Sequence, residues 1–151
     1  MSETFNKLMA SLATRIGLPS LSTTQDGIYD LFFDDLPLTF QYLPENDSLL
    51  LFSSLGKLPD QGREELCLKL LEANHFFSGT AGATLSAHRS TGLVGLHQVV
   101  PMQILDEARF LQILEAYMNT AEQWAKVCAK ADTPEPKPTG KNLPGAGWMP
   151  A

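Results

Sequence analysis

Residues 28–55 read IYDLFFDDLPLTFQYLPENDSLLLFSSL and contain three apolar runs, at 28–33, 36–43 and 49–52, separated by acidic turns. Each run has the length and composition of a β-strand, and the short loops between the runs predict an antiparallel meander. A strand with one solvent-facing side should alternate apolar and polar residues, but the first and third runs are apolar at both alternating positions. The stretch therefore predicts a sheet that needs cover on both faces, part of it from a partner.

Two amphipathic helices are predicted around this meander. Apolar residues recur at three- and four-residue spacing from Phe5 to Ile16, which is the pattern of a helix that packs one side on a core. A second helix is predicted after Gly62, because the same spacing returns there. Its apolar stripe is expected at Leu66, Leu70 and Ala73, with Cys67 and Leu71 beside them.

Two more strands are predicted at 83–89 and 93–100, joined by a turn at 90–92. Pro101 ends the strand pairing, and a long helix is predicted at 103–130. The order helix, three strands, helix, two strands, helix predicts an α+β fold with helices packed on an antiparallel sheet. The apolar side of the last helix is expected at Ile104, Ala108, Leu111, Leu114, Met118, Ala121, Ala125 and Cys128, widened by Phe110, Tyr117 and Trp124.

The composition changes after residue 131. Residues 132–151 read DTPEPKPTGKNLPGAGWMPA, and this density of proline and glycine cannot sustain a helix or a sheet ladder. We therefore predict a folded domain at 1–131 and a flexible tail at 132–151. Trp148 and Met149 near its end belong either to a loose terminus or to a short docking segment.

Charge and hydropathy exclude several classes of protein. The formal net charge is -6, with no lysine or arginine between residues 16 and 56, so a nucleic-acid or anionic membrane surface is not expected as a partner. No apolar run approaches the roughly 20 residues needed to span a bilayer, and the first residues do not resemble a secretory signal. Cys67 and Cys128 are far apart and are expected to be reduced thiols of an intracellular protein.

No catalytic or metal-binding constellation is predicted. His88 and His97 lie on neighbouring predicted strands and can approach across the turn at 90–92, but neither has an acidic or cysteine residue at metal-ligand spacing. The segment GTAGA at 79–83 lacks the Gly-Lys-Ser/Thr ending of a phosphate loop and precedes a strand instead of a helix. The sequence therefore predicts a protein-binding domain with no enzymatic activity, no metal and no cofactor.

Short phrases of the sequence carry a family resemblance. They are LLEANHFF at 70–77, GTAGATL at 79–85 and AEQW at 121–124, the last on a long helix that follows Pro101. With RIGL at 15–18, this succession resembles the class I type III secretion chaperones of the Tir-chaperone type, over residues 3–130. The resemblance implies a cytoplasmic homodimer from a Gram-negative bacterium. Such a dimer binds the N-terminal segment of a secreted effector in extended form and keeps it ready for secretion.

Two sets of candidate contact residues follow, and ordinary core packing is the alternative for each of them. For the partner we favour the first helix and the meander, above all residues whose neighbours already supply the opposite face of a strand. For the dimer interface the resemblance implies the second helix and the strands after it. The partner set is Phe5, Leu8, Leu12, Phe32, Leu50 and Phe52, and the dimer set is Leu66, Leu70, Leu85, Leu93 and Leu96.

Three functional hypotheses remain open at this point. The first is a non-enzymatic effector chaperone. The second is a regulatory partner protein that sequesters an activator or anti-activator and couples secretion to transcription; the segment RIGLPSLS at 15–22 resembles the start of such members. The third is a small hydrolase or ligand-binding enzyme that uses His88 and His97.

Overall fold

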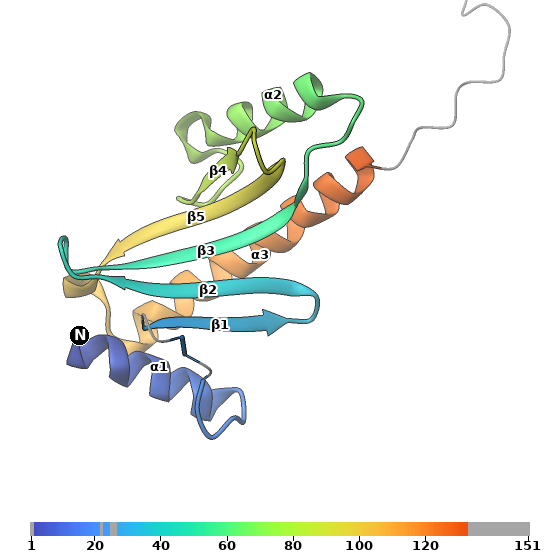
Figure 1. Ribbon diagram of the computed structural model, residues 1–151. Coiled ribbons are helices and arrows are strands. Elements are labelled where there is room, and N and C mark those ends of the chain that lie inside the picture. The colour runs from blue at the N-terminus through green and yellow to red at the C-terminus, as the bar shows by residue number, and fades with distance from the viewer. Residues whose placement is uncertain (1, 22, 25–26, 133–151) are drawn as a thin grey trace, which may run out of the picture.

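Five strands form one antiparallel sheet in the order β1-β2-β3-β5-β4 (Figure 1). The computed structural model describes residues 2–21, 23–24 and 27–132. The predicted meander of the first three strands and the predicted hairpin of the last two are both confirmed, and pairing between β3 and β5 joins them. The strands are β1 (Ile28–Phe33), β2 (Leu36–Leu43), β3 (Ser48–Lys57), β4 (Thr84–Ala87) and β5 (Leu93–Pro101).

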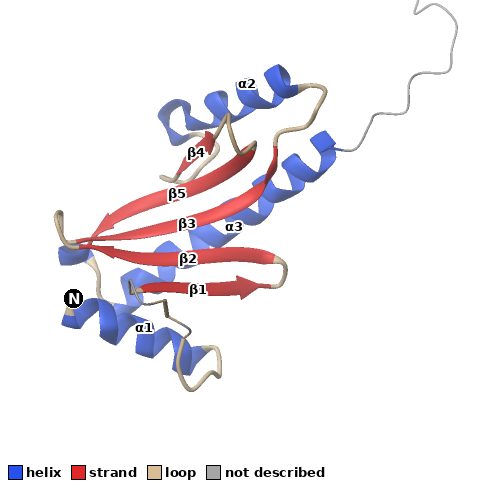
Figure 2. Cartoon of the chain, in the orientation of Figure 1, coloured by secondary structure: helices blue, strands red, loops and turns tan. Residues whose placement is uncertain are grey.

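The three α-helices are α1 (Glu3–Arg15), α2 (Arg63–Asn74) and α3 (Glu107–Asp132). Figure 2 shows α3 crossing behind the sheet, α1 beside β1, and α2 beside β4 at the opposite edge. The predicted α+β fold is confirmed, with its helices and strands in the predicted order.

Helix α1 is capped at both ends by the residues that its sequence provides. Ser2 accepts a hydrogen bond from the Phe5 N–H at 3.4 Å, and Gly17 follows the helix with a φ of 79°, a left-handed conformation that favours glycine. The Phe5 ring then docks the helix on the sheet, with its centroid 5.8 Å from that of Tyr42 and 5.6 Å from that of Tyr29. Complete burial of this ring contributes about 2–3 kcal/mol.

Helix α3 begins later than predicted, at Glu107 instead of residue 103. Asp106 caps it by accepting a hydrogen bond from the Arg109 N–H at 2.7 Å, and Met102–Ile104 form a separate 3-10 turn. The prediction that Ile104 and Ala108 belong to the buried side is wrong, because both are exposed. The buried side of α3 consists of Phe110, Leu114, Tyr117, Thr120, Ala121, Trp124 and Cys128.

The end of α3 bears on the predicted domain boundary. The helix includes Asp132, which the sequence assigns to the tail; the rest of the predicted tail, 133–151, lies outside the described residues. Within the described ranges, no helix is long and apolar enough to cross a membrane.

Candidate functional site

The sheet has a covered face and an open face, and alternate residues of β3 divide between them. Leu49 and Leu51 are buried on the covered face, where α3 packs, whereas Leu50 and Phe52 point the other way. On the same covered face, the ring of Phe40 in β2 contacts Phe110 of α3. Among the described residues, no helix packs on the open face (Figure 1).

Apolar side chains gather on the open face. We call Phe32 of β1, Leu50 and Phe52 of β3, and Val99 of β5 the open-face patch. Leu50 and Val99 are direct partners in the β3–β5 ladder, and Phe32 pairs with the half-buried Pro37 of β2. Phe32 is 73% exposed and Phe52 is 37% exposed, so the patch presents aromatic surface that the described residues leave open to solvent.

The two edges of the sheet differ in how their backbone groups are satisfied. At the β4 edge, the side-chain amide of Asn74 clasps the backbone of Leu85: the Leu85 N–H donates to Oδ1 at 2.8 Å, and Nδ2 donates to the Leu85 carbonyl at 2.9 Å. At the β1 edge, the Thr24 N–H donates to the Ile28 carbonyl at 2.8 Å. Because outward groups alternate along a strand, Phe32 also turns its N–H and C=O to this edge, and within the described ranges they have no partner.

One acidic side chain lies on the open face, and another lies in the turn between β2 and β3. Asp30 lies on the open face and accepts a hydrogen bond from Thr39 at 2.6 Å, and Asp47 in the β2–β3 turn accepts one from the Tyr42 hydroxyl at 2.8 Å. The hydrogen bond to Asp47, together with burial, raises the pKa of Tyr42. Since residues 16–56 contain no lysine or arginine, this half of the sheet has a negative rim.

The residues predicted to contact a partner fall into two groups. Phe32, Leu50 and Phe52 lie together on the open face, and their role in partner binding stays a prediction. The other three belong to α1 and are buried against the sheet as part of the core, so their side chains are not at the surface. These three are Phe5, Leu8 and Leu12.

The residues predicted for the dimer interface lie inside one protomer. Four of the five are buried, and Leu93 is half-buried; α2 packs its inward side against β4. The prediction that Leu71 belongs to the inward stripe is wrong, because this side chain is 64% exposed. It lies on a second apolar side of α2 that sequence reasoning missed, although leucines on both sides of the helix were the available signal. The buried residues are Leu66, Leu70, Leu85 and Leu96, and the exposed apolar residues of α2 and the turn after it are Leu68, Leu71, Phe76 and Phe77.

The two strand histidines do not form a pair. Thr84 is the ladder partner of His97, whereas the His88 N–H bonds the Leu93 carbonyl, so the histidines lie four ladder positions apart. The His88 ring instead lies 3.1 Å from the Thr91 hydroxyl within the turn. The described residues contain no group of three or more side chains able to hold a metal ion.

The glycine segment at 79–83 has a packing role. Gly79 accepts a hydrogen bond from the Trp124 Nε1–H at 2.8 Å, and a Cβ at this position would lie 2.9 Å from the Ala73 Cβ. Thr80 and Ala83 are buried, and the segment leads into a strand, so its amides do not form the anion site of a helix start.

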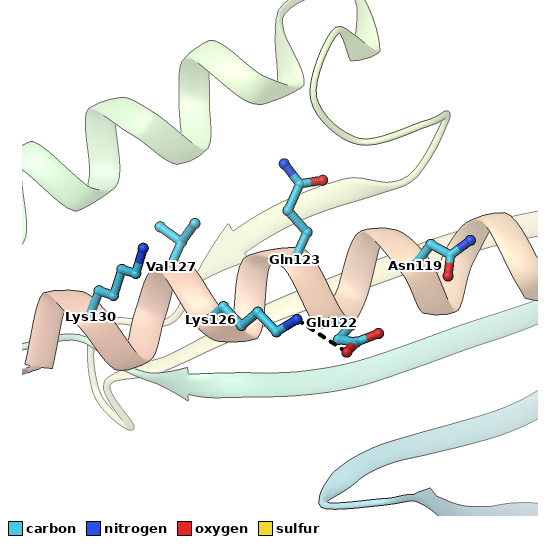
Figure 3. A pocket seen from close by; sticks show the side chains of 6 residues that line it. All are labelled: Asn119, Glu122, Gln123, Lys126, Val127 and Lys130. Carbon is cyan, nitrogen blue, oxygen red and sulfur yellow. Dashed lines mark ion pairs between the residues drawn. The ribbon is translucent and has the colours of Figure 1, made fainter.

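The surface of α3 carries a hollow of about 340 Å³ (Figure 3). All of its lining side chains come from this one helix, and Glu122 and Lys126 pair across it at 3.3 Å. No nucleophile stands beside a base in it, so the hollow has no arrangement suited to catalysis. It is lined by Asn119, Glu122, Gln123, Lys126, Val127 and Lys130.

Comparison with known proteins relates this chain to a protein family. Residues 7–125 match the family model described as the Tir chaperone protein (CesT) family. The chain is 42% identical over 127 residues to the transcriptional anti-antiactivator ExsC of Pseudomonas aeruginosa, which covers 81% of this chain and 83% of ExsC.

Solved structures of the same fold are complexes with partner proteins. The ExsC chain of the ExsC–ExsE complex superposes with a TM-score of 0.71 at 28% identity, covering 85% of this chain and 97% of the other. The HopA1–SchA chaperone–effector complex gives a TM-score of 0.65 at 19% identity, and the match covers 85% of this chain and 94% of the other. The ExoT–SpcS complex from Pseudomonas aeruginosa gives a TM-score of 0.61 at 22% identity, and the match covers 82% of this chain and 98% of the other.

The covered sheet, its open apolar face and these matches define a class: a type III secretion chaperone, which binds another protein and is not an enzyme. The chain belongs to the Tir chaperone protein (CesT) family. Membership agrees with the resemblance seen in the phrases at 70–77, 79–85 and 121–124.

Proposed function

We propose that this chain is a regulatory secretion chaperone of the cytoplasm, which sequesters an antiactivator of transcription and thereby couples secretion to transcription. The observation that carries this proposal is the 42% identity, over 127 residues, to the anti-antiactivator ExsC. The chains in the effector complexes share only 19% and 22% identity with this one, which supports a common fold but not a common partner.

The partner is a polypeptide segment that binds on the open face and along the β1 edge. Apolar side chains of the segment cover the open-face patch, and its backbone amides pair with the outward N–H and C=O of Phe32. Only a polypeptide offers both kinds of group at strand spacing. Because Asp30 lies on this face and residues 16–56 contain no lysine or arginine, the segment is expected to carry basic residues near its apolar ones.

A second copy of the chain is the partner of the exposed side of α2. The inward leucines are already used by the core, whereas Leu68 and Leu71 on α2 and the exposed rings of Phe76 and Phe77 after it are free to meet a second copy. A two-fold contact of this kind repeats the same apolar residues from both copies.

The second candidate function is an effector chaperone that holds the N-terminal segment of one effector ready for secretion. The fold shared with the HopA1–SchA and ExoT–SpcS complexes favours it. The two functions use the same face and differ in which protein occupies it.

Deletion of the gene, with and without complementation, separates the two functions. If the chain opposes an antiactivator, its loss leaves the antiactivator free, so transcription of the secretion genes should fall and recover on complementation. A strain with unchanged transcription but loss of one secreted effector would contradict the regulatory function and support the second candidate. Complementation with Phe52→Asp should fail in either case, while Lys126→Ala on the far side of α3 is the matched control.

A further inference from the structure

The ring of Phe52 rests on a glycine. A Cβ added to Gly95 of β5 would lie 3.0 Å from Cε2 and 3.5 Å from Cζ of Phe52, so the edge of the ring occupies the space that a side chain would fill. The same Cβ would lie 3.3 Å from the Ser86 hydroxyl of β4. Ring, glycine and serine are therefore in contact on the open face.

The ladder register shows which way the ring leans. The direct neighbours of Phe52 are Thr39 on β2 and His97 on β5, whereas Gly95 is the partner of Ser54, two residues further along β3. Phe52 thus reaches a diagonal neighbour on β5 and turns away from β2. Phe52 on the central strand β3 is half as exposed as Phe32 on the edge strand β1.

Gly95 occupies a position where its conformational freedom is not required. Its φ lies outside the left-handed region, and β5 pairs on both sides, with Ser54 of β3 and Ser86 of β4. Glycine weakens the interior of a strand because it adds backbone entropy and packs no side chain, so its presence there calls for a close approach by another group. That group is the Phe52 ring. The ladder partners of Gly95, Ser54 and Ser86, also have small side chains, so they leave space for the ring.

We propose that Gly95 is a positioning residue for partner binding: it makes room for the Cε2–Cζ edge of the Phe52 ring against β5, so that the rest of the ring meets the partner. The proposal rests on the proposed function of the open face and adds a residue that does not itself need to touch the partner. With alanine at position 95, the Phe52 ring must move by a few tenths of an ångström, and a larger side chain would displace it further, so the surface that the ring presents changes shape.

The seat is tested first in the free protein. An aromatic ring in contact with Gly95 should shift the Gly95 Hα resonances away from ordinary glycine values through its ring current, and Phe52→Leu should return them to those values. Resonances that are unshifted in the parent protein would overturn the seat itself, whatever the partner is.

The positioning role is tested by calorimetric titration with ExsE, using the parent chain and the variants Gly95→Ala, Phe52→Leu and the double variant. Gly95→Ala should bind about tenfold more weakly. It should cause no further loss in the Phe52→Leu background, since the smaller side chain leaves room for the added methyl group. Should Gly95→Ala unfold, the double variant restores the space and remains measurable. Unchanged affinity of Gly95→Ala, or losses that simply add, would overturn the positioning role.

Failure of the underlying function gives different results. No binding of ExsE by the parent chain overturns the proposed partner and, with it, the role of Gly95. If the parent binds but Phe52→Asp binds equally well, the open face is not the binding surface. The positioning role alone fails when Phe52→Asp abolishes binding and Gly95→Ala does not weaken it.

Discussion

Leu50 and Leu51 are adjacent leucines of one strand, and they lie on opposite faces of the sheet. Leu51 is fully buried on the covered face with Phe40 and the side chains of α3, whereas Leu50 pairs with Val99 on the open face. The two faces are thus almost equally apolar along β3 and differ in what covers them. The covered face holds the fold together, and the open face has surplus apolar surface that the fold does not need.

The largest effect should come from emptying the covered face. Leu51→Ala is expected to lower the free energy of unfolding by about 3 kcal/mol, because it removes buried methyl groups and leaves a cavity. Leu50→Ala, one residue away, should lower it by less than about 1 kcal/mol. Urea denaturation of both variants measures the difference, and equal losses would mean that the open face also supports the fold.

The open face should respond in binding instead of in stability. Phe32→Asp and Phe52→Asp are each expected to weaken partner binding at least about 30-fold, since a charge then replaces a ring at the centre of the contact. Both variants should keep the circular dichroism spectrum and the oligomeric state of the parent. Leu71→Asp on α2 is the matched control for an exposed apolar residue: it should weaken self-association and spare the partner site. Unfolding of Phe32→Asp or Phe52→Asp would identify these rings as core.

Much of this division is readable in the sequence, because the period of two places Phe32 opposite Leu31 and Phe33 on the strand. The burial of α1 cannot be predicted in this way. Its amphipathic stripe, which includes Phe5, has the same sequence pattern whether the helix packs on its own sheet or on a partner. The start of α3 depends on the cap that Asp106 provides, which moves the helix beyond Ile104.

Contacts between residues distant along the chain explain the remaining differences. The two hydrogen bonds between the Asn74 side chain and the Leu85 backbone join residues 11 positions apart, and no local sequence pattern predicts them. From the sequence alone, Gly95 is a residue that weakens a strand. The strand register and the distances in the structure show that the Phe52 ring contacts it. Burial of the predicted dimer leucines has the same origin: it depends on how closely α2 covers β4.

A smaller effect is expected within the covered face, at a buried hydroxyl. Tyr117 of α3 donates a hydrogen bond to the Leu96 carbonyl at 2.8 Å, and burial raises the pKa of this phenol well above 10. Tyr117→Phe should lower the free energy of unfolding by about 1 kcal/mol at neutral pH. Tyr42→Phe, which removes a solvent-exposed hydrogen bond at the rim, should cost less.

The same phenol predicts how stability depends on pH. Below about pH 10, Tyr117 is neutral in both the folded and the unfolded chain, so its contribution is fully present. Above that pH the unfolded chain releases the proton while the folded protein holds it, and stability falls as pH rises. Burial raises the pKa of Cys128 as well, so its thiol acts in the same direction. Tyr117→Phe in a Cys128→Ala background should flatten the decline between pH 9 and 11 in urea titrations; an unchanged slope would contradict this assignment.

The smallest effect is expected from removing residues 133–151. The buried core runs from Phe5 to Cys128, and α3 ends at Asp132, so a chain that stops at residue 132 retains every side chain of that core. The unfolding temperature should therefore stay within about 2 °C of the parent value, because a change of 1 kcal/mol moves it by roughly 2–4 °C in a domain of this size. Differential scanning calorimetry measures this directly. A larger drop would show that the segment covers apolar surface. The truncation would then be repeated in the Phe52→Asp and Leu71→Asp variants. The drop in unfolding temperature should vanish in the variant whose apolar surface the segment covers.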